Sequence, residues 1–106
     1  MVRFNFGSSS DLAAQIDQGA PADVFASADE PNMQKVVDSD MADGEPQDFA
    51  SNVLEIAVPR DNPGKVTGLD DFADKDLKLA VCDPEAPCGN AATEVFGNAG
   101  VDASID

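Results

Sequence analysis

The sequence contains no histidine, tyrosine or tryptophan, and these absences exclude several kinds of chemistry. Without histidine, the chain can form neither a Ser-His-Asp triad nor a Cys-His pair, and it has no histidine to bind a metal. Ser9 or Cys88 would lack a histidine base if either acted as a nucleophile, so we expect a protein that is not an enzyme. No apolar run approaches the roughly 18 residues of a membrane-spanning helix. A signal peptide is not expected either, because Met1 is followed at once by strand-like alternation.

Basic residues are also few, with 6 against 21 acidic residues and a formal net charge of −15 over 106 residues. A surface of this charge repels phosphate groups, which argues against nucleic acid and anionic lipid as partners. The acidity fits a well-solvated surface, adaptation to high salt or cation binding. The densest acidic run, residues 70–76, lacks the central glycine and terminal glutamate of a calcium loop. It therefore favours a solvated surface without a bound metal cation.

Segments typical of strands alternate with segments typical of helices, which predicts an α/β protein with a largely parallel sheet. Gly19 is placed to end a first helix, and Asp29 is placed to cap a second helix in which Pro31 occupies the first turn. The expected strands are residues 2–6, 22–27, 52–58 and 77–82. The expected helices run from just after Ser10 to about residue 18, over residues 30–38 and from about residue 90 to 96, with one short helical turn at 68–72.

The first candidate site follows the first expected strand, where Gly7 precedes Ser8, Ser9 and Ser10. The N-terminus of a helix exposes unpaired N–H groups, and together with serine hydroxyls these can bind an oxyanion without lysine or arginine. The alternative is that one serine caps the helix while the others fill the loop. The local pattern taken alone favours that alternative.

The second candidate site, residues 81–89, again joins an expected strand to the start of a helix. Amides around Cys88 and Gly89 could point at the same ligand from another side. Cys82 and Cys88 are the two cysteines of the chain, and their spacing differs from the Cys-x-x-Cys redox motif. Two cysteines without histidine make a poor zinc site. A disulfide between them is favoured over free thiols, which stay possible.

Three segments together resemble the periplasmic molybdate-binding proteins of bacterial ABC importers. Residues 6–29, FGSSSDLAAQIDQGAPADVFASAD, match the serine triplet, the Leu-Ala helix and the Gly-Ala-Pro-Ala-Asp run of that family in order and spacing. Residues 79–89, LAVCDPEAPCG, are similar to its Ala-Val-x-Asp-Pro segment in the version with two cysteines. Asn52–Pro59 is similar to the strand that crosses between its lobes.

The resemblance implies a periplasmic-binding-protein-like fold of type II, here incomplete, with a mostly parallel sheet and flanking helices. Residues 1–59 would be a partial first lobe and residues 60–106 a partial second lobe. A molybdate or tungstate anion would lie between the lobes, with no other cofactor. By position, Ser9 would donate its hydroxyl and amide to the anion, and Cys88 its amide. Ser8 and Ser10 would flank the site, and Asp23 and Asp29 would be structural.

Further ligands of the family come from a serine loop before the first strand, and from a later amide and tyrosine. We therefore expect a middle fragment whose binding is weak or absent in isolation. The full-length protein would be periplasmic, or anchored to the membrane outside the cell, and would deliver the anion to a membrane permease. The alternative is an acidic scaffold or interaction module without ligand binding. Such a module would self-associate, as in a homodimer formed through open sheet edges.

Overall fold

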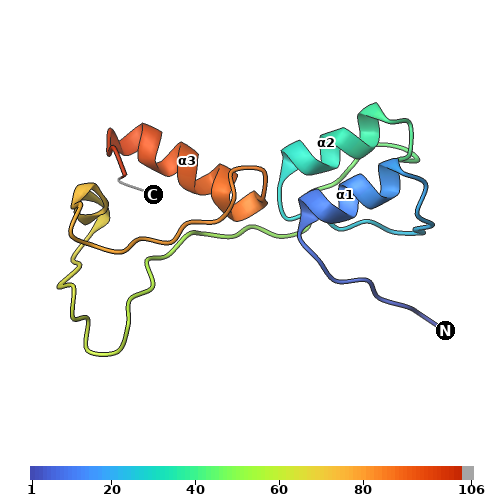
Figure 1. Cartoon of the computed structure of the whole chain (residues 1–106). Coiled ribbons are helices and arrows are strands. Elements are labelled where there is room, and N and C mark those ends of the chain that lie inside the picture. The colour runs from blue at the N-terminus through green and yellow to red at the C-terminus, as the bar shows by residue number, and fades with distance from the viewer. Residues whose placement is uncertain (104–106) are drawn as a thin grey trace. The chain divides into compact units, whose positions relative to one another are not determined.

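The computed structural model describes residues 1–103, so the last three residues of the predicted second lobe lie outside the described part. The chain divides into two compact units. The first unit contains residues 1–51 and 85–87, and the second contains residues 52–84 and the chain from Cys88 onward. The helices drawn in Figure 1 are α1 (Ser9–Asp17), α2 (Glu30–Asp38), the 3-10 helix η1 (Leu69–Ala73) and α3 (Pro87–Ala99).

Helices α1 and α2 form the core of the first unit and lie side by side (Figure 1). Ala13 of α1 and Val36 of α2 are buried, at 2% and 3% exposure. Both helices run in the same direction, because a bond from the Ala28 amide to Ser9 joins their beginnings. A bond from the Ser39 hydroxyl to Asp17 joins their ends. The small side chain of Ala13 allows this close packing.

The signals for the end of α1 and the start of α2 are confirmed, whereas α1 begins at Ser9, inside the serine triplet that was expected to precede it. Gly19 follows the end of α1 with a φ of 94°, a conformation that favours glycine. Asp29 caps α2 through its side chain, which accepts a hydrogen bond from the Asn32 amide. Pro31 lies in the first turn of α2, where its missing N–H is tolerated.

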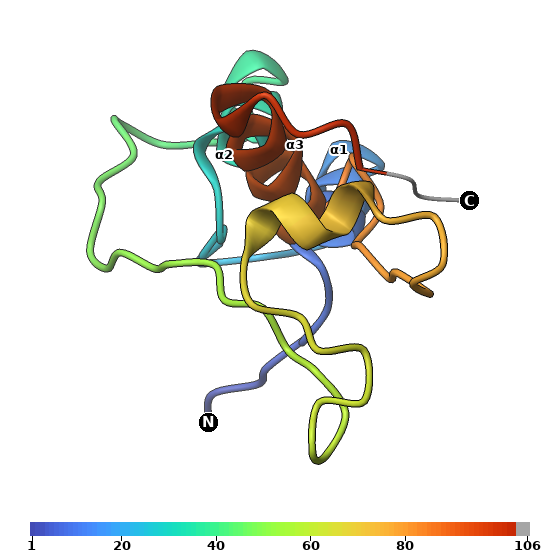
Figure 2. The same cartoon turned by 90° about the vertical axis from the view of Figure 1, so that its left-hand side faces the viewer.

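In the second unit, η1 packs against α3 (Figure 2). The rings of Phe72 and Phe96 lie 5.3 Å apart between centroids, and Ala92 is buried at 9% exposure. Helix α3 is longer than the expected segment 90–96 at both ends, since residues 87–89 are helical rather than part of a loop and the helix continues through Gly97 to Ala99. Pro87 fits this start, because its fixed φ suits the first helical position.

The four expected strands, and with them the parallel sheet, are absent from residues 1–103. A strand is stable when a neighbouring backbone pairs with it, and the described residues show no such pairing. Alternation of apolar and polar residues indicates a strand with one face that can be buried, but it does not provide the neighbouring strand with which the backbone must pair. Many apolar side chains of these segments are accordingly exposed: Val2, Phe4, Phe6, Val24, Val53, Leu54, Ile56 and Val58. The side chains of Leu77, Leu79 and Val81 are half-buried.

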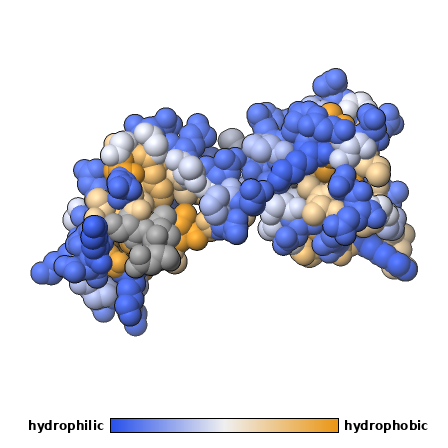
Figure 3. All heavy atoms as spheres, turned by 45° about the horizontal axis from the view of Figure 1, so that its top comes forward, coloured by the Kyte–Doolittle hydropathy of each residue, from blue (hydrophilic) through white to orange (hydrophobic). Residues whose placement is uncertain are grey.

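Hydrophilic residues cover most of the face drawn in Figure 3, and separate apolar patches lie among them. The acidic composition agrees with this surface. Among the helices of residues 1–103, none combines the length and the apolar character needed to cross a bilayer.

Candidate functional site

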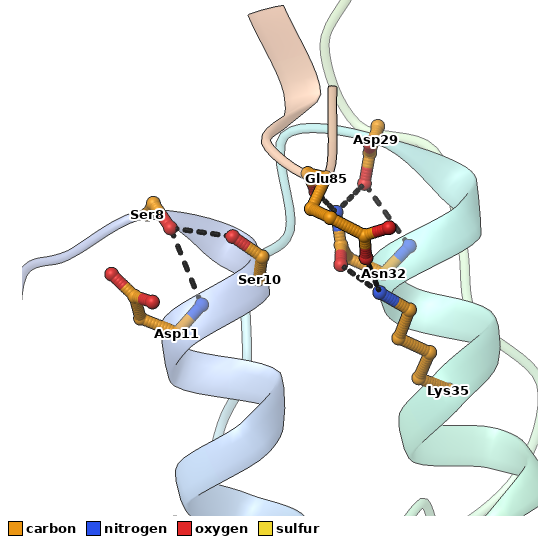
Figure 4. A network of polar contacts seen from close by, with 7 residues as sticks. All are labelled: Ser8, Ser10, Asp11, Asp29, Asn32, Lys35 and Glu85. Carbon is orange, nitrogen blue, oxygen red and sulfur yellow. Dashed lines mark hydrogen bonds and ion pairs between the residues drawn. The ribbon is translucent and has the colours of Figure 1, made fainter. Parts of the chain in front are cut away.

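The three serines lie at the start of α1, and Ser8 is its N-cap. Figure 4 shows Ser8 and Ser10 there. The Asp11 amide donates to the Ser8 hydroxyl oxygen at 3.2 Å. The hydroxyls of Ser8 and Ser10 share a hydrogen bond of 2.7 Å. The capping interpretation of the serine triplet is therefore correct for Ser8. It leaves Ser9 without a capping role.

Ser9 is the first residue of α1 and is 5% exposed. Its hydroxyl oxygen accepts a hydrogen bond of 2.8 Å from the Ala28 amide. A serine hydroxyl has one proton to donate in addition to its acceptor sites, so this bond fixes the oxygen and leaves the proton available. The Ser9 amide also belongs to the first turn, whose N–H groups have no acceptor within the helix. Ser9 can thus offer two donors at one place.

A second polar cluster surrounds the start of α2 (Figure 4). One carboxylate oxygen of Asp29 accepts from the Asn32 amide at 3.1 Å and from the Asn32 side-chain nitrogen at 2.8 Å. The same nitrogen makes a long contact of 3.5 Å with the Glu85 carbonyl oxygen. Lys35 donates to the Asn32 side-chain oxygen at 3.1 Å and lies 3.6 Å from the Glu85 carboxylate. This cluster holds residues 85–87 against α2.

The other carboxylate oxygen of Asp29 is buried, and the described residues offer it no hydrogen-bond partner. Burial of an unpaired carboxylate oxygen is unfavourable. The positive end of the α2 dipole lies beside this group and offsets part of the cost. Asp29 therefore has a structural role at the helix start, as its sequence position indicates.

Cys88 is an exposed residue in the first turn of α3, where backbone N–H groups lack acceptors within the helix. The structure joins it to Cys82 by a disulfide with Cα atoms 5.7 Å apart. Gly89 is buried next to the Cys82 and Asp83 carbonyls, and a Cβ at this position would lie 2.6 Å from the Cys82 oxygen. The loop that begins at Cys82 and leads into α3 is therefore closed tightly onto the start of that helix.

Ser8, Ser9 and Ser10 thus share one place in the first unit, whereas Cys88 belongs to the second unit. The prediction that Ser9 and Cys88 bind the same anion stays a prediction.

The role of Asn32 was not predicted from the sequence, although its position three residues after the cap Asp29 is a signal for a residue that bonds back to the cap. The contacts of Glu85 with α2 had no local signal, since they join segments 50 or more residues apart.

Comparison with known proteins gives the family. Residues 1–106 match the family described as bacterial extracellular solute-binding protein. The chain belongs to this family. No solved structure matches the chain with significance.

The curated relatives include molybdate-binding proteins. The chain is 40% identical to the molybdate-binding protein ModA of Mycobacterium tuberculosis (strain ATCC 25618 / H37Rv), over 94% of this chain and 38% of the relative. It is 37% identical to ModA of Escherichia coli (strain K12), over 91% of this chain and 40% of the relative. A putative ABC transporter substrate-binding lipoprotein of Bacillus subtilis (strain 168), YvgL, is 37% identical over 83% of this chain and 34% of the relative. The chain thus spans about two fifths, or less, of the length of these relatives.

Proposed function

We propose that the chain supplies part of a binding site for molybdate or tungstate in a protein that serves ABC-type import. The observation that carries this proposal is Ser9, which is buried at the start of α1 with its hydroxyl oxygen fixed by the Ala28 amide. A buried hydroxyl whose proton is available can donate to an anion with little loss of conformational freedom. The family, and the relatives named as molybdate-binding, support the choice of anion.

The proposed mechanism is binding and release without covalent chemistry. The hydroxyl and amide of Ser9 and the amide of Cys88 donate to the oxyanion, while Ser8 and Ser10 shape the turn. These donors are neutral dipoles that act on the anion at contact distance, so no cationic side chain is needed. The carboxylates of the chain lie farther away, and salt screens their repulsion of the anion. Molybdate and tungstate would be distinguished from sulfate by their larger size, because all three are tetrahedral dianions.

The whole protein would work outside the cytoplasm, in the periplasm or anchored to the outer side of the cell membrane, and would deliver the anion to a membrane permease. The chain spans about two fifths of the ModA relatives, and further ligands are expected from segments beyond it. A dianion bound by an incomplete set of donors loses about 1.5–3 kcal/mol for each missing hydrogen bond to a charged group. The 106-residue chain should therefore bind weakly.

Isothermal titration of the chain with molybdate, tungstate and sulfate tests this function. Molybdate and tungstate should bind more tightly than sulfate, and Ser9→Ala should weaken molybdate binding about tenfold or more. Ser51→Ala removes an exposed hydroxyl elsewhere and should leave the affinity unchanged. Circular dichroism checks that Ser9→Ala keeps its helices. Equal affinity for sulfate, or a folded Ser9→Ala variant that binds like the parent chain, would contradict the proposal.

The exposed apolar side chains favour self-association as a second candidate function. Phe4 and Phe6 are 76% and 88% exposed, and their rings stack at 5.6 Å between centroids. Such residues are available to pair with a second copy, although the net charge of −15 opposes contact between copies. Light scattering at rising salt concentration tests this function. A dimer that forms as salt screens the charge, without affinity for molybdate, would favour a scaffold over a transport role.

A further inference from the structure

We propose that Asn32 is a positioning residue that holds Glu85–Pro87 against α2 and thereby orders the loop leading into Cys88. The segment from Glu85 to Pro87 belongs to the same compact unit as α2. The role of this loop in anion binding rests on the proposed function, whereas the positioning itself does not.

The side chain of Asn32 is suited to this role because it is almost completely buried, at 1% exposure. Buried amides are usually fully hydrogen-bonded, and this amide contacts the cap Asp29, Lys35 of α2 and the distant Glu85. Its nitrogen donates to the Asp29 carboxylate at 2.8 Å and contacts the Glu85 carbonyl at 3.5 Å. Asp29 thus orients the nitrogen so that its remaining proton faces the Glu85 backbone.

Lys35 completes the arrangement from the next turn of α2. Its ammonium group donates to the Asn32 side-chain oxygen at 3.1 Å, which fixes the opposite end of the amide. It also lies 3.6 Å from the Glu85 carboxylate. Both side chains of this ion pair are largely exposed, at 54% and 81%, so the pair contributes little by itself. Within this cluster, the amide of Asn32 is therefore the buried side-chain contact between α2 and the loop.

The loop held in this way is short and restrained at both ends. Cys82 and Cys88 are joined by the disulfide, and Gly89 packs against the backbone of the same loop. The contact of Asn32 with Glu85 adds a third restraint in the middle. Fewer accessible conformations of the loop mean less freedom for the Cys88 amide to lose when an anion binds.

The direct test compares backbone order parameters from nitrogen-15 relaxation in the parent chain and in Asn32→Ala. This substitution keeps the capping bond of α2, because that bond is donated by the backbone amide of residue 32. The amides of residues 85 and 86 should fall from the values of rigid backbone, about 0.85, to below about 0.6, while those of α1 and α2 stay unchanged. Gln34→Ala is the matched control, since it removes an exposed side chain from the same helix.

Asn32→Asp gives a second variant of the same volume whose carboxylate cannot donate to the Glu85 carbonyl, so it should mobilise the loop as well. Glu85→Ala removes the exposed ion pair but keeps the carbonyl, and it should leave the loop ordered. Unchanged order at residues 85 and 86 in both Asn32 variants would overturn the proposal. Loss of order confined to α2 would do the same, because it would assign Asn32 to the helix alone.

Molybdate titration of the same variants separates this inference from the proposed function. If both hold, Asn32→Ala weakens binding about fivefold while Gln34→Ala does not. If the loop becomes mobile in Asn32→Ala but the parent chain does not respond to molybdate, the positioning role stands and the proposed function fails. If Asn32→Ala binds molybdate as well as the parent chain does, the loop plays no part in binding and its proposed link to the anion is wrong.

Discussion

At the scale of single residues, the carboxylate of Asp71 accepts hydrogen bonds from the backbone of a turn in the second unit. The backbone N–H groups of Thr67 and Gly68 donate to one of its oxygens at 2.6 and 3.0 Å. These bonds, with that of Thr67 as the larger cause, lower the pKa of Asp71 from its usual 3.8. Because folding lowers the pKa of Asp71, its ionised carboxylate stabilises the turn at pH values above the pKa that this group has in the unfolded chain. The contribution is lost as the pH falls through the folded-state pKa.

A pH titration followed by NMR tests this effect. The Asp71 carboxyl should titrate with a midpoint below 3.8, and the amide protons of Thr67 and Gly68 should shift with the same midpoint. Asp71→Asn keeps an acceptor oxygen but removes the titrating proton, so the shift of these amide protons should disappear. A midpoint at or above 3.8 would contradict the argument.

Two glycines of α3 allow a matched pair of alanine substitutions, whose expected effects on the free energy of unfolding have opposite signs. Gly89→Ala places a Cβ 2.6 Å from the Cys82 carbonyl oxygen and closer still to Asp83, so the loop must shift. We expect a loss of about 1–3 kcal/mol in the free energy of unfolding. Gly97→Ala meets nothing within 4 Å and should stabilise the chain by about 0.5–1 kcal/mol, through helix propensity. Urea denaturation measures both values, and equal effects of the two substitutions would contradict the packing described here.

The structure also shows which residue roles can be predicted from the sequence and which cannot. Asp29 and Gly19 act on their immediate neighbours, so their position relative to a helix is enough to predict their role. The role of Ser8 as the cap, and the burial of Ser9, depend on where the first turn begins and on the distant Ala28 amide. The contact of Asn32 with Glu85 joins two segments that are far apart in the chain, and no local pattern indicates it.

At the scale of elements, the helices were predictable and the strands were not. A helix satisfies its own hydrogen bonds, so its caps and apolar spacing predict it directly, as for α1 and α2. A strand depends on the backbone beside it, and the segments 2–6 and 52–58 have no such partner in the described part of the chain. Their alternation is consistent with strands, but the structure shows exposed apolar side chains instead.

The start of α2 offers a test at this scale. Asp29→Ala removes the oxygen that accepts from the backbone and side chain of Asn32, and it should cost about 1–2 kcal/mol of stability. Asp29→Ser keeps a capping oxygen and should lose less. The helical signal in circular dichroism during urea denaturation measures the difference. If alanine and serine are equivalent here, Asp29 is not the cap of α2.

At the scale of the whole molecule, the net negative charge is expected to make the stability of the chain depend on salt. A net charge of −15 on 106 residues destabilises compact states by self-repulsion, and salt screens this repulsion over distances beyond about 10 Å at 0.1 M. The urea midpoint should therefore rise when sodium chloride is increased from about 0.05 to 0.5 M. Potassium glutamate at the same ionic strength checks that the effect is not specific to chloride. A midpoint that falls with both salts would contradict the role of self-repulsion.

The central proposal is that Ser9 and Cys88 donate to one and the same oxyanion. Its most direct test is an NMR titration of the nitrogen-15-labelled chain with molybdate, which registers weak binding, with sulfate at equal ionic strength as the control. We predict that the amide signals of Ser9 and Cys88 shift together with one common midpoint, and that sulfate shifts them less. Separate midpoints, a response of one amide alone, or no response to molybdate would contradict the claim.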